Sequence, residues 1–286
     1  MHNFTIANAI AYGQGKLLSC SDSAKLDAQI LLAFVLDKAH SYLLSWPEHV
    51  LTPPVEQAYL ALLQRRIQGE PIAYITGVQE FWSLPFFVSP ATLIPRPDTE
   101  VLVELVLEHF SDVKQLTCLD LGTGTGAIAL ALASEQADWQ IDAIDFNIDA
   151  VALAKQNAKN LQLGHVNIYQ SNWFSAVEAH KYDVIVSNPP YIDALDEHLS
   201  QGDVRFEPNS ALIAPEQGLG DIKHIAQQAL GFLKPQGALY FEHGFEQAKA
   251  VRDILTNLGF ESPQTQKDFN GHDRITWALT CKAVEV

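Results

Sequence analysis

Cysteine is scarce in this sequence. Three cysteines occur among 286 residues, and Cys20, Cys118 and Cys281 lie far apart along the chain. An odd number of scattered cysteines fits neither a disulfide framework nor a zinc site, and we expect no bound metal. Because disulfides are rare in the cytoplasm, the simplest interpretation is a cytoplasmic protein with reduced thiols.

Long hydrophobic runs are also missing. The longest notable apolar stretch, residues 30–36, is far shorter than the roughly 20 residues that a membrane-spanning helix needs. The first residues, MHNFTIANAIAYGQGK, lack the basic segment followed by an apolar segment that is typical of a signal peptide. We therefore expect neither a membrane association nor a secretory signal.

Positive charge is in short supply. The chain has 18 Lys and Arg against 34 Asp and Glu, a net charge of -16, and Arg65-Arg66 is its only basic doublet. Phosphate contacts dominate the affinity of proteins for nucleic acids, so this charge disfavours a direct nucleic-acid partner. A protein or a cationic small molecule suits the charge better. We expect the protein to be a monomer.

The length of the chain suits two unequal domains. Residues 21–39 carry apolar side chains at helical spacing, and Thr52 followed by two prolines marks the start of a second helix that ends near residue 68. A further helix is plausible near residues 3–12. These segments predict a small helical domain over residues 1–75.

The next segment has a different composition. Residues 80–100 mix aromatic and β-branched residues with four prolines, which predicts a short hairpin or an extended linker. We assign residues 76–98 to this connection and residues 99–286 to a second domain.

Strand-like and helical segments alternate in the second domain, which predicts an α/β fold with a mostly parallel sheet and helices on both faces. A turn-like sequence at 269–273 separates two final strands and predicts an antiparallel hairpin. A parallel sheet that ends in such a hairpin is characteristic of the Rossmann-like class I methyltransferases. The expected strands are 117–121, 140–145, 166–170, 183–187, 237–242, 263–267 and 275–280, and the expected helices include 127–135, 148–161 and about 245–258.

A glycine-rich loop follows the first of these strands. The sequence LDLGTGTGAIAL, residues 119–130, runs from a strand through three glycines into a helix. Glycines let a ligand approach the backbone closely, and the helix N-terminus offers free N–H groups. Asp145 ends the next strand about 20 residues later, where a carboxylate can hold a ribose. The predicted cofactor-binding residues are Gly122, Thr123, Gly124, Thr125, Gly126 and Asp145.

The spacing of the glycines separates two cofactors. NAD-binding loops have the pattern G-x-G-x-x-G, whereas this loop has G-x-G-x-G with Asp120 just before it, and so resembles the loop of methyltransferases that use S-adenosylmethionine. The alternative is a tight turn with no ligand. In those enzymes a residue at the position of Trp173 lies against the adenine, and many have Asp where Asn172 stands. Packing of Trp173 in the core is the other interpretation.

The stretch YDVIVSNPPYID, residues 182–193, ends a strand in Asn188-Pro189-Pro190-Tyr191. Two prolines cannot continue a strand ladder, so a plain turn is one interpretation. Ligands of parallel α/β sheets, however, lie beyond the carboxyl ends of the strands. This strand should lie beside the glycine-loop strand, which would make the motif face the methyl donor.

These residue types suit methylation of an amide or amino nitrogen, whose lone pair is delocalised. The Asn188 side-chain oxygen and the Pro189 carbonyl would each accept one N–H and stabilise a pyramidal, charged transition state. Prolines stiffen the loop and offer only acceptors, and the Tyr191 ring would pack on the planar group. No general base is required before attack.

The motif matches the N/D-P-P-Y/F/W motif of amino-methyltransferases. The whole chain resembles the bacterial release factor glutamine methyltransferase family, the PrmC/HemK type, in domain order, in length and in the segments LIPRPDTE, LDLGTGTGAIALALA, SNWFSA, VSNPPYI, GDVRFEP and FEHG. This resemblance implies methyl transfer from S-adenosyl-L-methionine to the glutamine of the Gly-Gly-Gln motif in peptide chain release factors. The products would be N5-methylglutamine and S-adenosyl-L-homocysteine, and the helical domain would help to grip the release factor.

The resemblance also implies roles for single residues. Asn188 and Pro189 would be catalytic, and Pro190 and Tyr191 would join them in binding the substrate. Trp173 and Asn188 would contribute to the cofactor site. The roles of Arg96 and Glu207 stay open, since either residue can shape the pocket or pair with an opposite charge.

Four other functions remain as alternatives. A glutamine methyltransferase acting on a ribosomal protein would have the same motifs. A nucleic-acid adenine methyltransferase would need a basic groove and a recognition insert. An NAD-dependent oxidoreductase would leave the Asn-Pro-Pro-Tyr motif unexplained, and a binding protein without activity would hold S-adenosylmethionine without turnover.

Overall fold

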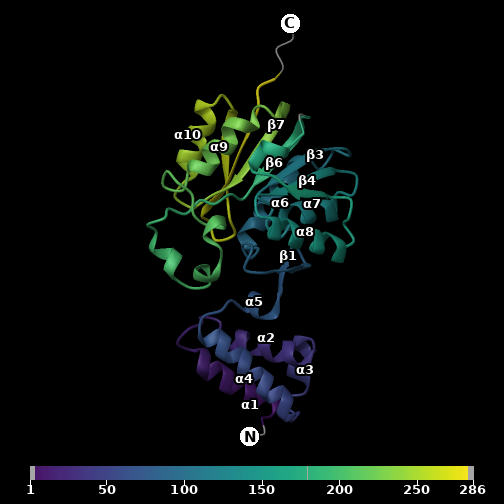
Figure 1. Cartoon of the computed structure of the whole chain (residues 1–286), viewed down its shortest axis with the longest axis vertical. Helices are drawn as coiled ribbons and strands as arrows, with labels where there is room; N and C mark the ends of the chain where they lie inside the picture. The colour runs from purple at the N-terminus through teal and green to yellow at the C-terminus, as the bar shows by residue number, and fades with distance from the viewer. Residues whose placement is uncertain (1–3, 179, 283–286) are drawn as a thin grey trace. The chain divides into compact units, whose positions relative to one another are not determined.

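The computed structural model describes residues 4–178 and 180–282, and it divides into two compact units. The first unit comprises the described residues up to Val78 together with Ser200–Phe206. The second comprises Gln79–Leu199 and the described residues from Glu207 onward. The chain therefore passes from one unit to the other three times. Figure 1 labels helices and strands of both units.

The first unit is helical, as its apolar periodicity predicts. Its helices surround a core that includes Leu31, Leu32 and Tyr59, all fully buried. The predicted helices at 21–39 and 53–68 are confirmed as α2 and α4. The helices are α1 (Ile6–Leu17), α2 (Ala24–Leu36), α3 (His40–Ser45), α4 (Pro53–Ile67) and α5 (Ile72–Thr76).

The bounds predicted for the first helix, residues 3–12, are wrong. Helix α1 begins after Thr5, whose Oγ1 accepts a hydrogen bond from the backbone N–H of Asn8 at 3.2 Å and caps the helix. The helix continues through Gly13, where a Cβ would clash with the Tyr59 hydroxyl. Glycine at this position permits close helix packing and does not end the helix.

A hairpin connects the helical unit to the second unit, and it confirms the hairpin interpretation of the proline-rich segment. Its strands are β1 (Val78–Phe81) and β2 (Leu84–Phe87). The two turn residues, Trp82 and Ser83, have φ values of 54° and 57°, as expected for a two-residue turn that matches the twist of the strands. Helix α6 (Pro97–His109) follows and begins on a proline, a favoured first helical residue.

The second unit contains a seven-stranded sheet in the order β5-β4-β3-β6-β7-β9-β8. The strands from β5 to β7 are parallel, and β9 is antiparallel to both β7 and β8. This arrangement confirms the predicted parallel sheet with an antiparallel C-terminal hairpin. The strands are β3 (Thr117–Leu121), β4 (Gln140–Asp145), β5 (Asn167–Gln170), β6 (Tyr182–Ser187), β7 (Leu233–Glu242), β8 (Glu261–Lys267) and β9 (Asp273–Leu279).

Helices cover both faces of this sheet. One apolar cluster joins the sheet to α6, α7 and α8, and a second joins its other face to α9 and α10. The last helix begins at Ala248, three residues later than predicted. The remaining elements are α7 (Ala127–Glu135), α8 (Ile148–Asn160), α9 (Gly220–Ala229), α10 (Ala248–Asn257) and the short 3₁₀ turns η1 (Trp173–Ala176), η2 (Glu197–Ser200), η3 (Val204–Phe206) and η4 (Asn209–Ala211).

Among the described residues, none of the helices combines the length and the apolar character needed to cross a membrane.

Candidate active site

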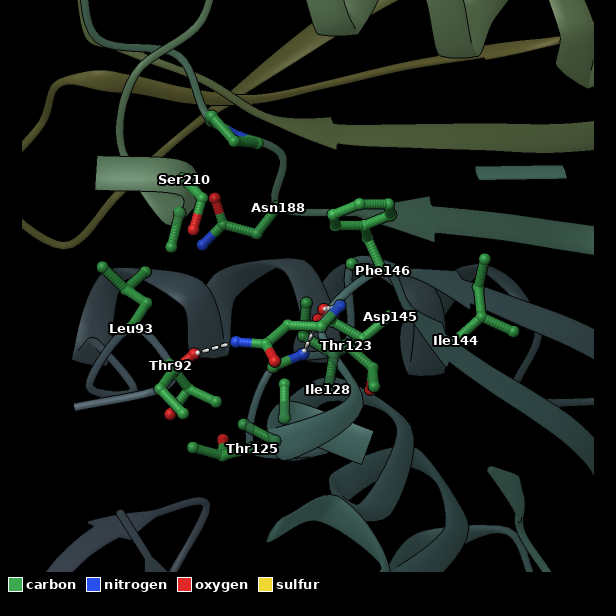
Figure 2. A pocket seen from close by; sticks show the side chains of 18 of the residues that line it. Thr92, Leu93, Thr123, Thr125, Ile128, Ile144, Asp145, Phe146, Asn188 and Ser210 are labelled. Carbon is green, nitrogen blue, oxygen red and sulfur yellow. Dashed lines mark hydrogen bonds between the residues drawn. The ribbon is translucent and has the colours of Figure 1, made fainter. Parts of the chain in front are cut away.

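A cavity of about 370 Å³ opens at the carboxyl ends of the parallel strands, entirely within the second unit (Figure 2). The chain order reverses here, since β3 is flanked by β4 on one side and by β6 on the other. Parallel α/β sheets bind their ligands at such a switch point. The cavity is lined mainly by residues from segments 91–99, 122–128, 144–150, 171–173, 188–190 and 210–211.

The glycine loop after β3 forms one wall of this cavity. Gly122, Gly124 and Gly126 have φ values of 72°, 56° and 85°, a region that other residues enter only with strain. Gly126 is the N-cap of α7 and does not line the cavity itself. The four preceding residues, Gly122 to Thr125, all do, so the predicted loop is placed where it can meet a ligand.

Asp145 joins the glycine loop to the end of β4. Its Oδ2 accepts a hydrogen bond from the Gly124 N–H at 2.9 Å, and its Oδ1 accepts one from the Asn147 N–H at 2.8 Å. Burial raises the pKa of Asp145, and these backbone hydrogen bonds oppose the rise. A carboxylate has about four acceptor positions, so Asp145 can still accept a hydrogen bond from a ribose hydroxyl.

Asp120 lies near the end of β3, where it bonds the glycine loop, and it does not line the cavity. The Thr123 hydroxyl donates to its Oδ2 at 2.6 Å, and the Ala129 N–H donates to the same oxygen at 3.3 Å. Complete burial raises the pKa of Asp120 to about 7. This acid therefore couples the shape of the loop to the start of α7.

Trp173 and Asn172 both line the cavity. The Trp173 ring also packs against the apolar cluster on the α9 and α10 face, so its side chain is partly core and partly cavity wall. A Cβ on Gly122 would lie 3.6 Å from the Trp173 ring, which shows how closely the indole approaches the glycine loop. The ring thus offers an aromatic surface next to the backbone that would hold the cofactor.

The Asn-Pro-Pro-Tyr segment reaches the cavity from the end of β6. Asn188 and Pro190 line it, whereas Pro189 is buried and Tyr191 packs against the apolar cluster on the α9 and α10 face. Asn188 Nδ2 donates a hydrogen bond to Thr99 Oγ1 at 3.3 Å. This contact fixes the amide by its nitrogen and leaves Oδ1 as the atom that can accept a hydrogen bond from a substrate.

Contacts from other elements hold the backbone of this segment. Gln247 Nε2 donates to the Tyr191 carbonyl at 3.0 Å, and Ile192 pairs with Ile213 in an isolated parallel bridge. A Cβ on Gly218 would clash with the same carbonyl. The backbone that follows Pro190 is therefore held by neighbouring elements.

Glu207 and Arg96 form an ion pair in the second unit. The Glu207 side chain is fully buried, and its Oε2 also accepts a hydrogen bond from the Ile94 N–H at 3.4 Å. Arg96 lines the cavity and Glu207 does not. Glu207 therefore anchors the segment 91–96, while Arg96 presents its charge at the cavity.

Several lining residues carry no signal in the sequence. Ser210 and Ala211 come from the turn η4, Asp221 comes from the start of α9, and Thr92 comes from the segment before α6. They lie outside the glycine loop and the Asn-Pro-Pro-Tyr segment, and the fold brings them to the cavity. Among the described residues, no group of three or more His, Cys, Asp or Glu side chains is placed to hold a metal ion.

The cavity suits S-adenosylmethionine. Part of its wall is glycine backbone, and a Cβ there would narrow the space. Asp145 offers carboxylate oxygens, and Trp173 offers an aromatic face. With a seven-stranded sheet that ends in an antiparallel hairpin, these features define a class I S-adenosylmethionine-dependent methyltransferase.

Comparison with known proteins narrows this class. The model of the methyltransferase small domain matches residues 98–207, and that of the PrmC N-terminal domain matches residues 8–77. Release factor glutamine methyltransferase of Shewanella oneidensis is 54% identical over 95% of this chain and 94% of its own length. The protein of the same name from Salmonella typhimurium is 55% identical over 90% of this chain and 92% of its own length. The chain belongs to the release factor glutamine methyltransferase family.

A solved structure supports the fold. A methyltransferase from Pyrococcus furiosus is 17% identical, covers 76% of this chain and 97% of its own, and superposes with a TM-score of 0.52. At this identity the likeness concerns the fold alone.

Proposed function

We propose that this protein transfers the methyl group of S-adenosyl-L-methionine to the side-chain amide nitrogen of the glutamine in the Gly-Gly-Gln motif of peptide chain release factors. The products are N5-methylglutamine and S-adenosyl-L-homocysteine. The observation that carries the proposal is the position of Asn188 and Pro190 in the cavity that the glycine loop also lines, in a chain of this family.

The cofactor site is built from three segments. Gly122 to Thr125 would surround the methionine end, the Asp145 carboxylate would accept the ribose hydroxyls, and Trp173 would pack on the adenine. The two oxygens of Asp145 accept backbone hydrogen bonds from Gly124 and Asn147, and the carboxylate has further acceptor positions for a ribose hydroxyl. Asn188 stands between this site and the substrate. The bound cofactor supplies an electrophilic methyl group.

Asn188 and Pro189 prepare the target nitrogen for attack. Asn188 Oδ1 and the Pro189 carbonyl each accept one of its hydrogens, which orients its lone pair and favours the pyramidal geometry of the transition state. The nitrogen becomes acidic once it is alkylated and loses its proton without a dedicated base. Hydrogen-bond acceptors that are already held in place do not have to reorganise during the reaction.

Pro190 and Tyr191 complete the substrate side. Pro190 lines the cavity and stiffens the backbone. Tyr191 follows it outside the cavity lining, and its ring would pack on the planar amide of the substrate. Burial raises the pKa of the Tyr191 hydroxyl, which stays neutral in the physiological range. Tyr191 therefore acts through packing and not through proton transfer.

The helical unit serves as the recognition domain for the release factor. It corresponds to the matched PrmC N-terminal domain at residues 8–77. The net charge of -16 supports a protein substrate over direct contact with nucleic acid. We propose that the enzyme acts as a monomer in the cytoplasm, where release factors function in translation termination.

A competition assay tests the substrate. The purified protein receives labelled S-adenosylmethionine with equal amounts of a release factor and of ribosomal proteins, and label is counted in each after separation. We expect the release factor to take up the label, and a release factor with Gln→Asn in its Gly-Gly-Gln motif to take up none. Label in a ribosomal protein and none in the release factor would favour the other glutamine methyltransferases.

A further inference from the structure

Glu242, the last residue of β7, lies beside the catalytic motif. Ser187 pairs with Phe241 in the parallel register of β6 and β7, so Asn188 and Glu242 follow next to each other at the same sheet edge. Glu242 is only 2% exposed. Its Oε2 is buried without a hydrogen-bond partner in the described structure. Burying a carboxyl oxygen without a hydrogen-bond partner costs free energy, so a buried carboxyl beside Asn188 calls for a functional explanation.

The Glu242 carboxyl lies close to the side chains of Asn188 and Thr99, and both of them favour its charged form. Asn188 Nδ2 also donates to Thr99 Oγ1 at 3.3 Å. A hydroxyl that accepts one hydrogen bond can donate its own hydrogen to another group. The three side chains therefore form one connected group.

Burial and neighbouring side chains shift the pKa of Glu242 in opposite directions. Burial is the largest effect and raises its pKa to about 7, while Thr99, Arg274 of β9 and Asn188 lower it. Asp98 of α6 raises it. Tyr191, which follows β6, also lies near enough to interact with this carboxyl, but its own pKa is raised and it stays neutral.

We propose that Glu242 is a positioning residue that sets the orientation of the Asn188 amide. As a carboxylate, Glu242 only accepts hydrogen bonds, so Asn188 must turn its NH₂ group toward Glu242 and Thr99. Asn188 Oδ1 then points toward the substrate side. This inference rests on the proposed role of Asn188 as the acceptor for the target amide.

A protonated Glu242 has the opposite effect. Its O–H can donate to Asn188 Oδ1, which stabilises the flipped amide. A flipped Asn188 would present its NH₂ group to the NH₂ group of the substrate, and the target nitrogen would lose one of its two acceptors. Turnover should therefore fall as the pH drops through the pKa of Glu242.

The test compares wild type with Glu242→Gln. We measure kcat at saturating cofactor and release factor from about pH 5.5 to about pH 8.5. Wild type should show a rise of kcat with an apparent pKa near 7. Glu242→Gln should lose this rise and turn over roughly 10-fold more slowly above pH 7, because glutamine can donate as well as accept.

Two controls separate this role from general damage. Glu246→Gln changes an exposed carboxylate four residues away and should keep the wild-type profile. The S-adenosylmethionine Kd of Glu242→Gln should stay within about twofold of wild type, since Glu242 does not line the cavity. A pH profile in Glu242→Gln that retains the rise would overturn the proposal and direct attention to Asp120, whose pKa is also about 7.

A second readout needs no turnover. The NMR signals of the Asn188 side-chain NH₂ group are identified by their loss in Asn188→Ala. In wild type with bound cofactor they should shift with a midpoint near pH 7, and a pH-independent signal would contradict the proposal even if Glu242→Gln fails to fold. If wild type shows this titration but does not methylate a release factor, the substrate assignment fails and the positioning role stands.

Discussion

Asp145 Oδ2 accepts a hydrogen bond from the backbone N–H of Gly124 across 2.9 Å. The carboxylate at the end of β4 is thereby tied to the middle of the glycine loop that follows β3. A second bond, from the Asn147 N–H to Oδ1, fixes the other oxygen. The two segments with which we propose the protein holds its cofactor form one hydrogen-bonded unit.

Asp145→Ala should weaken cofactor binding about 10- to 100-fold, because hydrogen bonds to a charged acceptor contribute more than neutral ones. Isothermal titration with S-adenosylmethionine measures the Kd. Asp149→Ala is the matched control, since Asp149 is exposed on the neighbouring helix turn and outside the cavity. Equal affinities for wild type and Asp145→Ala would refute the ribose role.

Gly124→Ala tests the backbone of the loop. The residue has φ 56°, so alanine is strained by about 1–2 kcal/mol, and its Cβ would enter the cavity. We expect weaker cofactor binding and a small loss of thermal stability. Gly271→Ala has similar strain at φ 84° in the β8–β9 turn, with open space around its Cβ, and should lose stability without losing cofactor affinity. Equal cofactor affinities for wild type and Gly124→Ala would contradict the close approach of cofactor and loop.

Asn188→Ala should lower kcat by roughly 10²–10³ through the loss of one preorganised acceptor. The cofactor Kd should stay largely intact, because the glycine loop and Asp145 are unchanged. Asn167→Ala removes an exposed asparagine that bonds Asp142 outside this cavity, and it should behave as wild type. Steady-state kinetics separate kcat from KM, and full turnover by Asn188→Ala would contradict the proposed mechanism.

Arg66→Met should destabilise the helical unit by about 3–5 kcal/mol. The Arg66 side chain is 10% exposed and bonds Asp27 at 2.7 Å and Asp203 at 2.9 Å. Its loss leaves the buried Asp27 carboxylate without a charged partner, with only the hydroxyls of Ser21 and Ser23 bonded to it. Arg65→Met is the control, because the Arg65–Glu70 pair is more exposed and should contribute about 1 kcal/mol or less. Urea unfolding of both variants gives the comparison, and equal losses would contradict this account.

Much of the fold was predictable because its signals are local. The strands of the parallel sheet are short apolar runs, and each is separated from the next by a segment with helical or turn composition. The error in α1 has a physical cause, since Gly13 resembles a helix end but serves close packing against Tyr59. The segment 200–206 follows the catalytic motif in sequence but belongs to the helical unit, and its Asp203 pairs there with Arg66.

The residues of the site also differ in how far the sequence indicates their roles. The glycine loop, Asp145 and Asn188 lie in motifs whose residue types and spacing already indicate their chemistry. Glu242 lies in the FEHG segment, but that segment does not indicate its role, because the role comes from the register that places it beside Asn188. Long-range pairing of this kind depends on the assembled sheet and not on a pattern within one segment.

The central claim is methyl transfer to one amide, and tandem mass spectrometry of a release factor treated with this protein and S-adenosylmethionine tests it most directly. The account predicts that the Gly-Gly-Gln peptide gains one methyl group on the glutamine side chain with wild type and gains none detectable in the same time with Asn188→Ala. A peptide that stays unmodified with wild type, or a methyl group on any other residue, would contradict it.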